Sequence, residues 1–181
     1  LFREIARRGD DLTHQVHVSY IEIYNNEAFD LLATSALQDG LTVEETGDRV
    51  GHAFDDLPRV TLHMGEGGVV STRNMSRHRA ESEEAALNLL FLGDTNRSVA
   101  ETPLNEVSSR SHAVFIVAIS STRPGTDAVR RSKLNLVDLA GSERVHRTGI
   151  DGLLLKEACS INLALHFLER VIVALHQRGH D

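Results

Sequence analysis

Hydrophobic and polar residues alternate along segment 16–24 ("VHVSYIEIY"), a pattern typical of a β-strand. Between positions 20 and 24 apolar residues stand on both sides of the alternation, which predicts a strand covered on both faces. The following asparagine pair should end this strand. We interpret the next segment, "EAFDLL" (27–32), as a short helical turn.

Further strands are predicted in the second half of the chain. The almost continuously apolar run 114–119 predicts a buried strand, and "SKLNLVD" (132–138) predicts a strand that runs into a glycine-containing loop. "RPGT" (123–126) predicts the turn between them. Weaker strand candidates lie at 41–46 and 49–57.

Helices are predicted where apolar residues recur at spacings of three and four. "SEEAALNLLFLG" begins with Ser82 as a cap and two glutamates at the positive end of the helix dipole, and Gly93 can stop it. Segment 156–175 predicts a helix of about five turns. Segment 1–11 is similar to the last turns of a helix. Strands interleaved with helices predict an α/β domain with a central sheet.

Segment 63–80 is polar, contains glycines and has no hydrophobic period. We interpret it as a long exposed loop, which is uncommon in a compact domain unless it is functional or disordered.

Composition narrows the classes of protein and partner. The chain has 181 residues, 41% of them hydrophobic, which is enough for one domain with a core. A single cysteine, Cys159, excludes an internal disulfide and fits a reducing compartment. The net charge of −7 indicates no general attraction to nucleic acid or anionic lipid, so an acidic partner must meet a local basic patch. No unbroken apolar run reaches the roughly 18 to 20 residues of a spanning helix, so no membrane partner is expected.

The first polar motif, "VDLAGSE" (137–143), follows a predicted buried strand. The carboxylate of Asp138 can hold a magnesium ion, directly or through water. Gly141 has no Cβ, so its N–H can approach a terminal phosphate closely. Alternatively, Asp138 caps the next turn and Gly141 only shapes it.

The second polar motif, "NEVSSRSH" (105–112), precedes a predicted buried strand. Hydroxyls of Ser108 and Ser109 can bind magnesium or orient a water molecule, and Asn105 can hydrogen-bond a phosphate. The guanidinium of Arg110 suits a carboxylate or a phosphate. Alternatively, this segment is a polar turn whose serines hydrogen-bond their own backbone.

Together the two motifs resemble the switch regions of a kinesin motor domain. "HVSYIEIYNNEAFDLL", "GDTNRSVAETPLN" and the helix 156–175 are also similar to kinesin segments, the last to the relay helix. The resemblance runs from about Val18 to Leu175 and is interrupted at 63–80, where it implies a loop insertion. "LHFLERVIVAL" is similar to the kinesin-9 branch, known mostly from cilia and flagella.

The resemblance implies that residues 1–181 are the central part of one motor domain. Its fold would be a P-loop NTPase-like α/β core, with a central sheet flanked by helices and incomplete at both ends. It further implies a cytoplasmic protein of the cytoskeleton. Oligomerisation would depend on a stalk outside these residues.

The implied cofactors are ATP and Mg²⁺, sensed by switch I (105–112) and switch II (138–143). By motif position, Ser109 would bind magnesium and Asp138 would hold it through water. Gly141 would donate its N–H to the γ-phosphate.

The same resemblance implies roles in hydrolysis for four side chains. Asn105 and Ser108 would place the attacking waters or relay their protons. Arg110 and Glu143 would pair across the site as a gate that closes for hydrolysis.

The implied partner is the microtubule, because the relay helix and the loop before it contact tubulin in kinesins. The basic candidates on this acidic chain are Arg144, Arg147, Lys156 and Arg170. A solvated helix face is an alternative interpretation of Arg170. Leu163 and Ala164 depart from the family pattern, which has a basic residue and a serine at these positions.

The phosphate-cradling pattern G-x-x-x-x-G-K-[ST] matches no stretch of these residues. We therefore expect negligible ATPase activity from the 181 residues alone. Two other function classes stay open, a microtubule-binding module without ATPase activity and a GTPase-like switch protein, since D-x-x-G also occurs there.

Overall fold

The computed structural model describes residues 1–8, 12–33, 57–66, 70–100, 110–141 and 152–178. The expected strand at 41–46, and the expected strand at 49–57 except for its last residue, lie outside these ranges.

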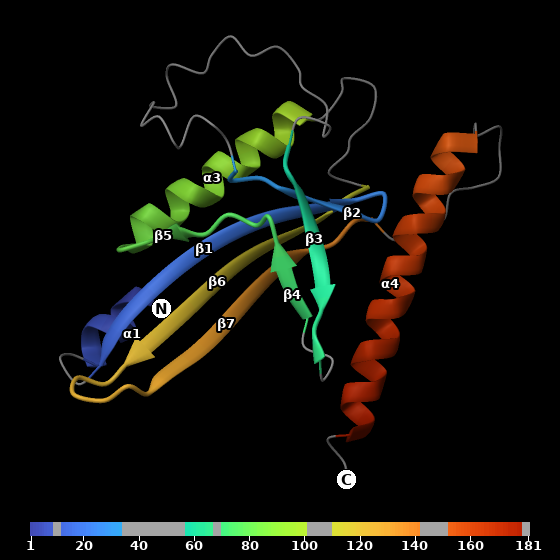
Figure 1. Ribbon diagram of the computed structural model, residues 1–181. Helices are drawn as coiled ribbons and strands as arrows, with labels where there is room; N and C mark the ends of the chain where they lie inside the picture. The colour runs from blue at the N-terminus through green and yellow to red at the C-terminus, as the bar shows by residue number, and fades with distance from the viewer. Residues whose placement is uncertain (9–11, 34–56, 67–69, 101–109, 142–151, 179–181) are drawn as a thin grey trace.

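Strands form one sheet in the order β4-β3-β2-β1-β6-β7, with the short β5 paired to β1 (Figure 1). Every pairing between these strands is antiparallel. The strand bounds are β1 Thr13–Tyr24, β2 Glu27–Asp30, β3 Arg59–Met64, β4 Val70–Arg73, β5 His78–Arg79, β6 His112–Thr122 and β7 Val129–Asp138. The described helices are α1 Phe2–Arg8, α3 Glu83–Ala100 and α4 Gly152–Arg178. The predicted mixed α/β class, with helices beside a central sheet, is confirmed.

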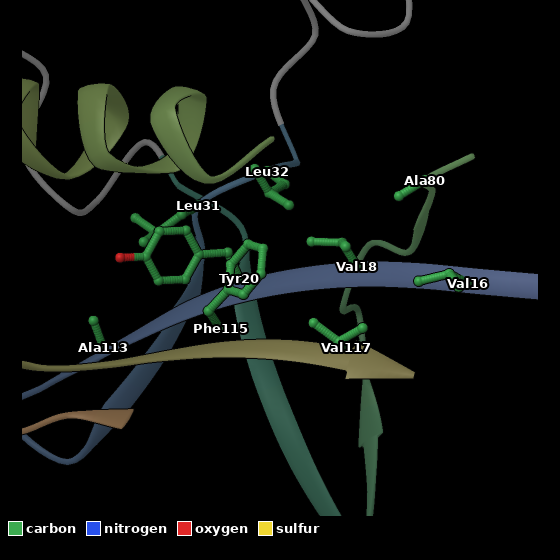
Figure 2. Close-up of a cluster of buried hydrophobic side chains, with 9 residues drawn as sticks. All are labelled: Val16, Val18, Tyr20, Leu31, Leu32, Ala80, Ala113, Phe115 and Val117. Atoms are coloured by element: carbon green, nitrogen blue, oxygen red, sulfur yellow. The ribbon is translucent and has the colours of Figure 1, made fainter. Parts of the chain in front are cut away.

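The core lies between α3 and the two longest strands, β1 and β6 (Figures 1 and 2). The alternation in β1, which the sequence predicted, turns Val16, Val18 and Tyr20 toward α3. The Tyr20 ring meets Phe115 of β6 edge to face, with centroids 5.4 Å apart. Figure 2 also shows Leu31, which follows β2, beside these rings.

The asparagine pair after β1 makes a hairpin, and the expected helical turn at 27–32 is wrong. Asn25 and Asn26 adopt φ values of 49° and 65°, which suit the tight two-residue turn that joins twisted antiparallel strands. The chain therefore returns along β1 as β2, with Ile21 opposite Asp30.

The helix α3 continues past Gly93, where the sequence predicted its end. Gly93 instead gives room to the Tyr20 ring, because a Cβ at this position would lie 2.2 Å from Tyr20 Cδ1. Residues beyond Gly93 also bond to the sheet region. Asp94 Oδ1 accepts a 2.8 Å hydrogen bond from the Tyr20 hydroxyl, and Asn96 Nδ2 donates one of 2.7 Å to the Leu31 carbonyl. These contacts hold the last two turns of the helix in place.

Most of the described part of 63–80 is exposed, as expected, but Ala80 is buried in the core and the segment is not simply a loop. β3 and β4 form a hairpin in which Thr61 lies opposite Arg73. Within 63–80, β4 and the last two residues of β3 have no buried face, and the sequence therefore shows no hydrophobic period there. After the hairpin the chain is fixed by Asp30, which accepts hydrogen bonds from the backbone N–H and the hydroxyl of Ser76.

The helix α4 spans more residues than the predicted 156–175, and its expected apolar stripe is not buried within the described residues. Leu168, Ile172 and Leu175 are all exposed. By length and composition, segment Cys159–Gln177 could cross a membrane. The expectation that no segment spans a membrane considered only unbroken apolar runs. Segment Cys159–Gln177 contains polar residues, but its mean hydropathy is high.

Candidate functional site

The described parts of the two polar motifs, 110–112 and 137–141, lie near each other where β6 begins and β7 ends (Figure 1). Ala113, the second residue of β6, lies opposite Asp138, the last residue of β7. Arg110 occupies a turn just before β6, and Gly141 lies just after β7; both are partly exposed. One edge of the sheet therefore carries the described parts of both motifs.

Asp138 presents its carboxylate to solvent at this edge. Its side chain is 70% exposed, and Oδ2 accepts a 3.1 Å hydrogen bond from Nη1 of Arg97. Arg97 belongs to the part of α3 beyond Gly93, so the continuation of this helix brings the cation to the strand end.

A buried acid stands on the other side of Arg97. Glu22 of β1 has no exposed surface, and its Oε1 lies 3.0 Å from Arg97 Nε. The hydroxyl of Ser111 donates to the same Oε1 atom and accepts a 3.2 Å hydrogen bond from Arg97 Nη2. Glu22, Arg97 and Ser111 thus form a buried network whose guanidinium also reaches Asp138, and we call these four residues the Arg97 network.

Burial by itself would lower the pKa of Arg97. The hydrogen bond with Asp138 and the charge of Glu22 outweigh this effect and raise the pKa. The guanidinium therefore stays charged while it bridges a buried carboxylate and an exposed one. Such a bridge fixes the end of β7 relative to β1 and α3.

His112 joins the start of β6 to the loop that follows β7. The backbone N–H of Ala140 donates a 3.0 Å hydrogen bond to Nδ1 of the His112 ring. Burial lowers the pKa of His112, against a smaller opposite effect from the charge of Asp138. Both observations favour the neutral ring, because Nδ1 must be free of hydrogen to accept.

The structure describes only some of the predicted site residues. Arg110, Asp138 and Gly141 lie at the shared edge of the sheet, and Arg170 is exposed on α4. Lys156 lies within the first turns of α4. The remaining predicted residues fall outside the described ranges: Asn105, Ser108, Ser109, Glu143, Arg144 and Arg147.

Sequence reasoning did not predict the inner members of this site. Glu22 carried a usable signal, because a charged residue within an otherwise buried strand needs a partner. Its partner Arg97 is distant in sequence, and only the fold reveals the pair. Ser111 and His112 stand beside Arg110 in the motif but point to the buried network and to Ala140.

The described residues contain no group of three or more His, Cys, Asp or Glu side chains that could hold a metal ion. Asp138 nevertheless fits a magnesium ion held through water. It is an exposed oxygen donor, and only its Oδ2 atom is engaged by Arg97.

A family model described as "Kinesin motor domain" matches residues 1–181. Among curated proteins, kinesin-like protein KIF9 of Mus musculus is 40% identical over 185 residues, which cover 100% of this chain and 21% of that protein. Kinesin-like protein KLP1 of Chlamydomonas reinhardtii is 39% identical over 181 residues, covering 98% of this chain and 21% of that protein. The chain thus spans about a fifth of the length of these relatives.

Solved structures agree with these matches. A fast kinesin is similar with a TM-score of 0.68 and 30% identity, over 89% of this chain and 40% of that chain. KIF14 in its two-heads-bound state, with AMP-PNP on a microtubule, is similar with a TM-score of 0.73 and 28% identity. That match covers 99% of this chain and 47% of the KIF14 chain. The predicted resemblance to kinesin motors, including the kinesin-9 branch, is confirmed.

Proposed function

Because the chain belongs to the kinesin motor domain family, we propose that it senses the γ-phosphate of ATP and couples that signal to microtubule binding. The observation that carries this proposal is that the described parts of the two motifs, 110–112 and 137–141, lie at one edge of the sheet. The start of β6 and the end of β7 lie side by side there, with Asp138 exposed and anchored by Arg97.

Magnesium, when bound with ATP, would neutralise phosphate charge at this edge. Asp138 would hold it through water and Ser109 would bind it directly. The Arg97 network supports this role, because it holds the Asp138 carboxylate through Oδ2 while the side chain stays largely exposed. A carboxylate that is oriented in advance loses less conformational entropy on binding a cation.

Hydrolysis would depend on the same edge. Asn105 and Ser108 would place the attacking waters and relay protons, and the N–H of Gly141 would bind the γ-phosphate. Arg110 and Glu143 would close over the site as an ion pair. The partly exposed position of Arg110 beside the strand end supports its access to such a partner.

Microtubule binding would belong to α4 and the segment before it. The exposed α4 surface, with Arg170 upon it, supports this assignment. Arg144, Arg147 and Lys156 would add positive charge to a chain that is acidic overall, which suits the acidic surface of tubulin. We accordingly propose that the protein is located on the cytoskeleton. The similarity to the kinesin-9 branch further suggests a location in a cilium or flagellum.

A microtubule-binding module without ATPase activity is the alternative function. The structure describes Arg110, Asp138 and Gly141 at their motif positions. Their presence supports an ATP-hydrolysing motor over this alternative. We further propose that the 181 residues alone do not turn over ATP, because none of their segments matches the phosphate-cradling pattern.

ATP turnover by the full-length protein, with and without microtubules, tests the proposal. We expect microtubules to stimulate turnover, and Asp138→Asn to abolish most of it while microtubule co-sedimentation in AMP-PNP persists. Asp127→Asn is the matched control, since it neutralises an exposed carboxylate at the opposite end of the β6–β7 hairpin. Microtubule binding without any ATP turnover by the wild type would favour the alternative function.

A further inference from the structure

His112 is the last residue of the switch I segment and the first residue of β6, and it is buried. Its Nδ1 atom accepts the N–H of Ala140, which is itself buried and directly precedes Gly141. On its other side, the neighbouring Ser111 is tied to Glu22. The start of β6 is thus fixed to β1 and to the loop after β7 at consecutive positions.

The bonding of the His112 ring is unusual for a residue that only fills space. In the neutral ring Nδ1 is the acceptor, so Nε2 carries the hydrogen. That Nε2 atom is buried, and it has no hydrogen-bond partner among the residues that the structure describes. A buried donor without a partner destabilises the fold, and an apolar side chain of similar size would avoid this cost. The bond to Ala140 is therefore the chemical feature that distinguishes histidine from an apolar residue here.

We propose that His112 is a positioning residue that couples the two switch segments through its hydrogen bond with Ala140. The bond fixes the peptide on the N-terminal side of Ala140 relative to the start of β6. It thereby sets where the next amide, that of Gly141, can meet a phosphate. This inference rests on the proposed function for its effect on catalysis, but the bond itself can be tested independently.

Three substitutions separate positioning from packing. In His112→Asn, Oδ1 can take the place of Nδ1 as an acceptor, although the side chain is smaller. In His112→Gln the acceptor is displaced toward the Nε2 position, and His112→Leu fills the volume with no acceptor. Packing alone predicts that Leu replaces histidine best, whereas positioning predicts that Asn does.

Hydrogen exchange at the Ala140 amide, measured in the full-length protein, is the direct readout. We expect protection in the wild type and in His112→Asn. In His112→Leu and His112→Gln exchange should be about tenfold faster, the change that loss of one hydrogen bond produces. Equal protection in all four proteins, or better protection in Leu than in Asn, would overturn the proposal.

ATP turnover is the second readout. For Leu and Gln we expect kcat to fall about tenfold with ADP affinity within about twofold of wild type, and for Asn we expect kcat to be largely retained. Faster Ala140 exchange with unchanged kcat would refute the positioning role. If the wild type itself turned over no ATP, the proposed function would fail, while Ala140 exchange would still decide whether the bond exists. Should Leu fail to fold, the Asn and Gln pair gives the same comparison.

Discussion

Arg97 Nε lies 3.0 Å from Oε1 of Glu22, a side chain with no exposed surface. Within the described residues this pair ties α3 to β1 beneath the proposed nucleotide site. A buried ion pair contributes little net stability compared with apolar packing, but breaking it leaves an uncompensated charge. The pair therefore makes the site sensitive to single substitutions.

Replacing Arg97 with alanine should lower the free energy of unfolding by about 3–5 kcal/mol, because Glu22 would remain buried without its cation. Urea unfolding of the full-length protein, followed by a signal from this domain, measures the change. Arg59→Ala is the matched control, since Arg59 pairs with Glu27 at 2.7 Å on the exposed surface. It should cost only about 0–1 kcal/mol. Equal losses in the two variants would contradict the buried-charge argument.

The sequence predicted β1 and β6, in which burial and period coincide. Both strands contain buried apolar residues, so the alternation in β1 and the apolar run in β6 were sufficient to predict them as strands. The sequence also predicted the strand β7, but the expectation that this strand is buried is wrong, because every residue of β7 is exposed. β4 has no buried face, so no hydrophobic pattern could predict it. The end of α3 was misjudged because glycine commonly ends helices, whereas Gly93 serves the packing of Tyr20.

For the candidate site, sequence order and spatial order differ. The residue pattern of the two motifs was enough to predict that Arg110 and Asp138 belong to one site. In the structure, the register of β6 and β7 places the ends of their segments side by side. The buried partners Glu22 and Arg97 are 75 positions apart, and no local pattern links residues at that separation. The packing of α3 against β1, and the continuation of α3 past Gly93, bring them into contact.

Replacing Gly93 with alanine should destabilise the protein, although alanine favours helix formation by about 1 kcal/mol. The new Cβ would lie 2.2 Å from Tyr20 Cδ1, and overpacking of this kind costs about 1–3 kcal/mol or more. Thermal unfolding of the variant, alone and combined with Tyr20→Leu, measures the effect. The double variant should lose less than the sum of its single changes.

Gly125→Ala provides the contrast for that experiment. Gly125 has φ of +77° and open space around it, so its substitution strains the backbone without touching Tyr20. Its cost should be additive with Tyr20→Leu. Coupling of Tyr20 with both glycines alike would show that the ring contact is not the cause.

Stability should depend on pH through His112. Burial lowers the pKa of this ring in the folded state, while the unfolded ring has its ordinary value of about 6.5. Between the two values the unfolded chain binds a proton that the folded chain does not. The free energy of unfolding should therefore fall as the pH is lowered through and below about 6.5, and this contribution is absent above that value.

Urea unfolding of the wild type and of His112→Asn at pH 7.5 and pH 5.5 isolates this contribution, because asparagine does not titrate. The wild type should lose more stability between the two pH values than the variant. An identical loss would assign the pH dependence to other groups.

Replacing Arg110 with alanine should strongly slow ATP hydrolysis while largely sparing nucleotide affinity. In the proposed gate Arg110 pairs with Glu143 and not with the nucleotide. Loss of the Arg110 side chain should therefore affect closure of the gate more than binding of the nucleotide. Single-turnover hydrolysis and ADP binding by the full-length protein measure the two quantities separately. Arg123→Ala, which removes an exposed cation at the β6–β7 turn, should leave both unchanged. Normal turnover by Arg110→Ala would refute the gate.

Replacing Arg144 and Arg147 with alanine should weaken microtubule binding at low ionic strength, by roughly fivefold for each charge that contributes about 1 kcal/mol to the interaction. The difference from wild type should shrink as salt is added, because salt screens charges that solvent reaches. Co-sedimentation of the full-length protein at two salt concentrations measures both effects. Arg130→Ala and Arg131→Ala on the exposed strand β7 remove equal charge away from α4 and serve as controls. If these controls weakened binding equally, the net charge of the protein, and not a tubulin-facing cluster, would govern the interaction.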